Sequence, residues 1–82
     1  MTIQDLQDGQ TVTLRLGRAG RHQVDWEDWE DVKIRVGRSK NGQVIGVRPT
    51  NDSFWAEYDP RHDYHDGCFL AEDYYMEIQG LL

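Results

Sequence analysis

Two stretches of alternating apolar and polar residues constrain the fold of this chain more than any other feature. In residues 11–17, and again in residues 31–37, every second side chain is aliphatic and most of the side chains between are polar or charged. A period of two is typical of a β-strand that buries one face and leaves the other in solvent. The inward-facing residues are expected to be Val12, Leu14, Leu16, Val32, Ile34 and Val36.

Three further strands are expected, at residues 43–48, 54–58 and 72–82. The first of these follows Asn41-Gly42, a pair that favours the positive dihedral angles of a tight hairpin turn. Five short strands joined by glycine-bearing turns predict an all-β fold, in which partial closure protects the exposed strand edges. We expect a small five-stranded antiparallel SH3-like barrel or bent sheet, with long loops at residues 17–30 and 59–71. An OB-like barrel is the alternative, and residues 2–7 are expected to form one helical turn.

The length of 82 residues predicts a single domain, residues 1–82, with a small core. The only cysteine is Cys68, so no internal disulfide can form and a reducing compartment is indicated. The N-terminus lacks the basic and apolar regions of a secretion signal, and no stretch has the ~18 apolar residues of a membrane span. We therefore expect a cytoplasmic protein that does not interact with membranes.

The most unusual composition lies in residues 25–31, which we name the acidic segment. It contains five carboxylates and two indoles in seven consecutive residues, without a basic residue among them. A packing element would not place two large aromatics within such like-charge repulsion, so the segment is interpreted as a recognition surface for a protein partner with a basic surface. One helical turn would bring both indoles to one side, with Asp25 and Asp28 alongside. The predicted partner-binding residues are Asp25, Trp26, Glu27, Asp28, Trp29, Glu30 and Asp31, with Trp55 and Tyr58 as further aromatic anchors.

The net charge of −6 is distributed in blocks along the chain. Residues 32–48 carry five basic residues and no acidic one, so this block is expected to neutralise the acidic segment. The C-terminal half would then provide the net acidic field, which repels phosphates and argues against direct binding to long nucleic acids.

A basic strip is the alternative binding site. Arginines on the first strand and basic residues on its neighbour could hold a small anion or a nucleotide, with Trp55 or Tyr58 stacking on a base. The chain would then sequester its ligand. The residues of this strip are Arg15, Arg18, Arg21, Lys33 and Arg35.

A metal site is a weaker hypothesis. His62, His65 and Cys68 follow one another at a spacing of three, and imidazole and thiolate are suitable zinc ligands. Structural zinc sites usually combine two closely spaced ligands with two distant ones, and no second pair exists here unless His22 supplies a fourth ligand. The simpler interpretation is a polar loop after which Cys68 begins a strand as a small buried residue. No cofactor is therefore expected.

Catalysis is not expected either. The only serines, Ser39 and Ser53, lie in turns, and no histidine and acid follow in the arrangement that activates a serine. A chain of this size also offers little room for a cleft with an oxyanion hole.

The layout of acidic and aromatic residues resembles that of SH3 domains that bind basic, proline-rich peptides, although the first strand lacks their aromatic motif. In size and acidity the chain is also similar to small proteins that phages and prophages encode to block bacterial defence complexes. That similarity implies an inhibitor whose acidic segment takes the place of phosphates in a basic groove. Pairing of edge strands with a second copy, giving a homodimer, is a further alternative.

Overall fold

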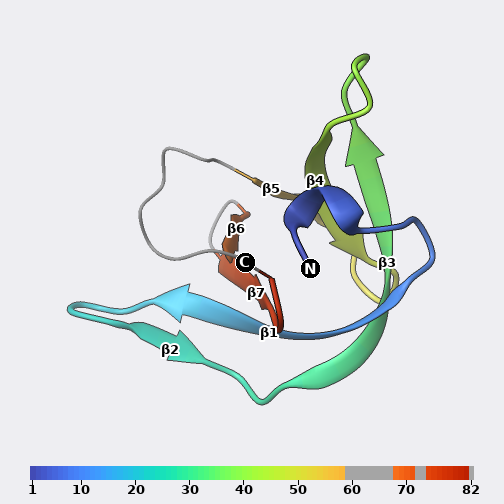
Figure 1. Cartoon of the computed structure of the whole chain (residues 1–82). Helices are drawn as coiled ribbons and strands as arrows, with labels where there is room; N and C mark the ends of the chain where they lie inside the picture. Colours follow the sequence, from blue (N-terminus) through green and yellow to red (C-terminus); the bar gives the residue numbers. More distant parts are fainter. Residues whose placement is uncertain (59–67, 72–73, 82) are drawn as a thin grey trace.

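The chain is built almost entirely of β-strands in the computed structural model, which describes residues 1–58, 68–71 and 74–81 (Figure 1). A single turn of 3-10 helix, η1 (Ile3–Asp5), precedes the strands. The strands are β1 (Thr11–Ala19), β2 (Val24–Trp26), β3 (Glu30–Arg38), β4 (Val44–Pro49), β5 (Ala56–Glu57), β6 (Cys68–Leu70) and β7 (Tyr74–Ile78). The predicted all-β class is confirmed.

The strands form one antiparallel sheet that closes on itself. Their order is β2-β1-β3-β4-β5-β6-β7, and β1 also pairs with β7 through residues 14–18 and 74–78. Six strands therefore make a closed barrel, while β2 extends β1 outside it. The prediction of a small antiparallel barrel of the SH3-like or OB-like kind is confirmed.

The number of strands differs from the prediction. All five expected strands are present, but the fourth contains only Ala56–Glu57, and the described residues include two additional strands, β2 and β6. β2 falls within the expected loop at residues 17–30 and pairs with the end of β1, from Gly17–Trp26 to Ala19–Val24. β6 falls at the end of the expected loop at 59–71. Both strands have three residues, which is too short for an alternating pattern to be recognised.

The hairpin between β3 and β4 forms where Asn41-Gly42 predicted it, but with a different turn. The Gly42 amide donates to the Ser39 carbonyl at 2.9 Å, which places Lys40 and Asn41 at the centre of the turn. Gly42 has a φ of 79°, and no non-glycine residue of the described chain has a positive φ. The turn therefore needs a left-handed residue only at Gly42, as in longer hairpin loops.

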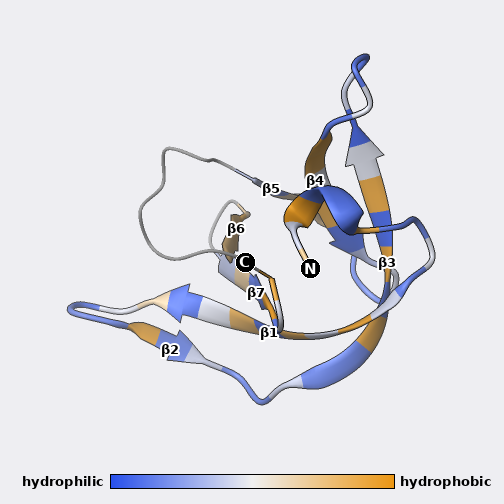
Figure 2. Cartoon of the chain, in the orientation of Figure 1, coloured by the Kyte–Doolittle hydropathy of each residue, from blue (hydrophilic) through white to orange (hydrophobic). Residues whose placement is uncertain are grey.

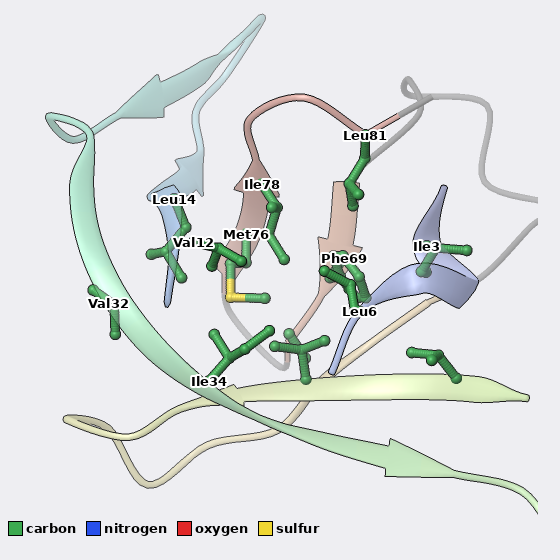
Figure 3. Close-up of a cluster of buried hydrophobic side chains, with 13 residues drawn as sticks. Ile3, Leu6, Val12, Leu14, Val32, Ile34, Phe69, Met76, Ile78 and Leu81 are labelled. Carbon is green, nitrogen blue, oxygen red and sulfur yellow. The ribbon is translucent and has the colours of Figure 1, made fainter. Parts of the chain in front are cut away.

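The core lies inside the barrel and receives side chains from almost every element (Figure 3). The central residues are fully or almost fully buried, and the inward faces of β1 and β3 are those that the alternation predicted, although Leu16 and Val36 are only partly buried. The buried side chains with the largest volumes include Phe69, Leu6, Leu14, Ile34 and Met76.

The expected N-terminal helical turn is confirmed as η1, and it brings two residues into the core. Ile3 and Leu6 are buried among the strand side chains. Arg38 holds this segment in place, because its guanidinium donates to the carbonyls of Leu6 at 2.8 Å and Gly42 at 2.7 Å. Within the described residues, no helix has both the length and the apolar character needed to cross a membrane.

Two isoleucines on neighbouring strands, one buried and one exposed, allow the burial inside this barrel to be tested. Ile34 is fully buried, whereas Ile45 is 52% exposed where β4 contains an irregularity in its pairing with β3. We expect Ile34→Ala to lower the free energy of unfolding by about 2–5 kcal/mol, since it removes buried methyl groups and leaves a cavity. The matched variant Ile45→Ala should change it by less than about 1 kcal/mol. Urea denaturation measures both, and similar losses for the two variants would contradict the burial described here.

Candidate functional site

The acidic segment follows the side of β1 as the chain passes from β2 to β3. Trp26 is paired with Gly17, and Glu30 is paired with Leu14, so residues 27–29 cross the intervening stretch of β1 without regular structure. The Glu27 amide donates to the Leu16 carbonyl at 2.8 Å. The predicted helical turn is therefore wrong, because both ends of the segment are held in an extended conformation by pairing with β1.

Both indoles of the acidic segment nevertheless meet at one place, the side chain of Arg15. The Arg15 Cζ lies 4.4 Å from the centre of the Trp26 ring and 4.5 Å from that of Trp29. An Arg15 terminal nitrogen also donates to a Glu77 carboxylate oxygen at 3.2 Å. We name these four residues the arginine clamp. The two tryptophans share one side, as predicted, but the reason is a cation that both rings contact and not a helix.

Gly17 gives the Trp26 ring room to lie over β1. A Cβ atom on Gly17 would stand 2.5 Å from Val24 Cγ1 and 2.6 Å from Trp26 Cε3, which is closer than atoms can approach. Asp25 lies between Val24 and Trp26 on β2. It is paired with Arg18, and its side chain faces the other side of the strand. It therefore does not lie beside Trp26, in contrast to the arrangement expected from a helical turn.

The carboxylates of the acidic segment remain largely open to solvent. All five acidic residues are exposed. Asp31 accepts a hydrogen bond from Thr13 Oγ1 at 2.6 Å, and Glu30 accepts one from Asn51 at 3.3 Å. Across residues 1–58, 68–71 and 74–81, none of the five forms an ion pair.

The basic block of residues 32–48 does not neutralise the acidic segment, contrary to expectation. Arg35 pairs with Asp8 at 3.0 Å. Arg38 donates instead to the main-chain carbonyls of Leu6 and Gly42. Figure 1 shows why: β3 leads away from the acidic segment, so the β3–β4 hairpin lies far from β2. Figure 2 shows that the residues along the passage from β2 into β3 are mostly hydrophilic.

Beside the arginine clamp, the surface forms a cleft of about 360 Å³, which we name the acidic cleft. Its aromatic wall is a stacked pair, Phe54 and Tyr74, with ring centres 5.9 Å apart. The Arg18 guanidinium lies 5.1 Å from the centre of the Tyr74 ring and donates to its hydroxyl at 3.1 Å. The residues lining the cleft are Leu14, Arg15, Leu16, Arg18, Glu27, Asp28, Glu30, Asp52, Phe54 and Tyr74.

The sequence did not point to Asp52, Phe54 or Tyr74 as site residues. Each is distant in sequence from the acidic segment. Tyr74 reaches the cleft through the pairing of β7 with β1, and Asp52 and Phe54 reach it by following β4, which pairs with β3. The one available signal was that two faces of the fourth strand both carry aromatics, which implied that Phe54 and Trp55 point in opposite directions.

Trp55 and Tyr58, predicted as further anchors, line a different groove. This groove, of about 440 Å³, also involves Gly37, Ile45 and Gly46. Trp55 is 49% exposed and lies over Gly37, where a Cβ atom would come within 3.3 Å of its ring. Neither residue lines the acidic cleft, so the structure does not combine the third tryptophan with the other two.

The residues of the predicted basic strip are not gathered around one cavity. Arg15 and Arg18 both line the acidic cleft, but in the company of four carboxylates. Arg35 pairs with Asp8, while Arg21 and Lys33 are exposed in the β1–β2 turn and on β3. Among the described residues, these five basic side chains therefore do not form a common anion pocket.

Of the three weak metal-ligand candidates, His62 and His65 lie outside the described residues. Cys68 is buried at the start of β6, as the simpler interpretation proposed. Burial, and to a lesser extent the negative charge of Glu77, raises the pKa of its thiol to about 11. The described part of the chain contains no group of three or more histidine, cysteine or acidic side chains placed to hold a metal.

Comparison with protein-family models, with curated proteins and with solved structures gave no match for this chain.

The environment of Cys68 predicts an unreactive thiol. A pKa raised from 9.0 to about 11 lowers the thiolate fraction near pH 8 by about 100-fold, and burial further limits access to the sulfur. We expect the native protein to react with DTNB at least about 100-fold more slowly than the protein unfolded in urea. Cys68→Ser gives the background rate. A native rate close to that of the unfolded chain would contradict the burial of this side chain.

Proposed function

We propose that this chain is a non-catalytic binding module that recognises a positively charged surface of a protein partner through the acidic segment and the adjoining acidic cleft. The observation that carries this proposal is the set of five exposed carboxylates without an ion pair among the described residues. Holding like charges together costs free energy, and a basic partner would remove that cost on binding.

The acidic cleft supports a specific kind of contact. Its carboxylates, contributed by Glu27, Asp28, Glu30 and Asp52, outnumber the two guanidinium groups in the lining. The aliphatic stem of a lysine or arginine could pack on Phe54 while its charged end meets the carboxylates. The cleft is therefore suited to a basic side chain that projects from the partner.

If the acidic segment acts as a mimic of phosphates, its partner would be a protein whose basic groove normally holds a nucleic acid. The alternative of an SH3-like binder of proline-rich peptides has less support, because Trp26 and Trp29 already contact Arg15. Trp29 is 37% exposed, which leaves only part of one indole for stacking on prolines.

An NMR titration tests the proposal directly. We would add a ten-residue arginine-rich peptide, and its glutamine counterpart as an uncharged control, to the ¹⁵N-labelled protein. We expect the arginine peptide to shift the amides of the acidic segment and of the cleft residues, and the glutamine peptide to shift none. Binding should weaken as salt rises from about 0.05 to 0.2 M, since exposed charges are then screened.

A matched pair of single-charge variants separates this site from the general negative charge of the protein. Asp28 lines the cleft, whereas Glu57 is exposed in the Trp55 groove. We expect Asp28→Asn to weaken peptide binding by about threefold to fivefold, equivalent to about 1 kcal/mol, and Glu57→Gln to change it by less than about twofold. Equal effects of the two variants, or shifts spread over all acidic positions, would contradict the proposed site.

A further inference from the structure

We propose that Arg15 is the positioning residue of the acidic segment: the arginine clamp fixes the two ends of residues 27–29 and thereby presents Glu27 and Asp28 at the acidic cleft. Whether this arrangement serves binding rests on the function proposed above, but the role of the clamp in holding the segment can be tested without any ligand.

The backbone of this stretch has little to hold it. Residues 27–29 lie outside the strands. Among the described backbone hydrogen bonds outside the strand ladders, they contribute one, from the Glu27 amide to the Leu16 carbonyl. The conformation of the segment therefore depends on its side chains, and Trp26 and Trp29 both contact the same guanidinium.

The arginine clamp lies beside the stretch of β1 that residues 27–29 cross without strand pairing. Arg15 lies on β1 between Leu14, which pairs with β3, and Gly17, which pairs with β2. The two indoles reach back to it from the two ends of the crossing, so Glu27 and Asp28 are bracketed by anchored residues. Both carboxylate residues line the cleft directly beside Arg15.

The environment of Arg15 makes its contacts strong. Its side chain is 26% exposed and that of its partner Glu77 is 16% exposed. Arg15 Nε is buried and has no hydrogen-bond partner among the described residues. Contacts between a cation and an aromatic ring gain strength when the cation is withdrawn from water, which applies to this guanidinium.

The same contacts argue against Arg15 as an anion ligand. The indoles of Trp26 and Trp29 lie close to its guanidinium, and one terminal nitrogen is bound to Glu77. A phosphate in the acidic cleft would also meet the like charge of four carboxylates, those of Glu27, Asp28, Glu30 and Asp52. Arg15 therefore acts on the acidic segment and not on a ligand.

Arg15→Met tests this role, because methionine keeps much of the side-chain volume and removes the charge. The matched control is Arg35→Met, in which the arginine pairs with Asp8 at 3.0 Å and does not line the acidic cleft. In the free protein, we expect Arg15→Met to shift or broaden the amide signals of residues 26–30 while the signals of β3 and β4 persist. Arg35→Met should leave the signals of residues 26–30 unchanged.

Peptide affinity gives a second readout, because a loss of charge and a loss of positioning change the affinity in opposite directions. Arg15→Met makes the protein more negative, so charge alone would tighten binding of the arginine-rich peptide. If Arg15 positions the acidic segment, binding should instead weaken by about tenfold, and Arg15→Lys should lose part of the affinity despite keeping the charge. Equal or tighter binding to Arg15→Met, with unchanged signals at residues 26–30, would overturn the proposal.

Two outcomes need separate treatment. If Arg15→Met does not fold, Trp29→Leu at the more exposed end of the clamp supplies the same two readouts. Its charge is that of the wild type, so the expected result is weaker peptide binding with shifted signals at residues 26–30, and unchanged binding with unchanged signals would overturn the proposal. If the wild-type protein does not bind the peptide, the proposed function fails. The amide signals of the free variants would then still decide whether Arg15 holds residues 26–30.

Discussion

The pairing of β1 with β7 is the contact on which the rest of the structure depends. β1 has three neighbours along its length: β3 pairs with residues 11–14, β2 with residues 17–19, and β7 with residues 14–18 on the opposite edge. Without β7 the sheet would remain open, and Phe69, Met76 and Ile78 would not cover the inward face of β1. The same pairing brings Glu77 to Arg15 and Tyr74 to Arg18, so barrel closure also assembles the acidic cleft.

The acidic segment holds like charges close together, and two guanidinium groups, those of Arg15 and Arg18, line the adjoining cleft. Of the two, Arg15 is the one that contacts both indoles. Arg15 lies beneath the segment, partly withdrawn from water, between two indoles and a carboxylate. It attracts the segment toward the barrel wall without pairing with any carboxylate of residues 25–31 that the structure describes. The aromatic rings are thus used for support, which leaves the carboxylates available for contacts with another molecule.

The strands were predictable because each long one has one buried and one exposed face, and this condition imposes a period of two on residues 11–17 and 31–37. β2 and β6 could not be predicted, since a strand of three residues is too short to show a period of two. The acidic segment was recognised from its composition, but its conformation was not. The spacing of three between Trp26 and Trp29 suggested a helical turn that would place both indoles on one side. In the structure, both indoles lie on one side because both contact Arg15 from an extended chain. Asp52, Phe54 and Tyr74 could not be assigned to the site without knowing how β4 pairs with β3 and how β7 pairs with β1.

The distance along the chain between Arg15 and Glu77 has a consequence for how this protein is made. These partners are separated by 62 positions, and the strands that carry them close the barrel. Contacts between distant segments form late, because the chain entropy lost on bringing them together must be offset by contacts that already exist. On the ribosome, β1 and the acidic segment emerge well before β7 is synthesised. During that interval the indoles and carboxylates of the segment have no finished barrel to lie against, so the acidic cleft is complete only once β7 has joined the sheet.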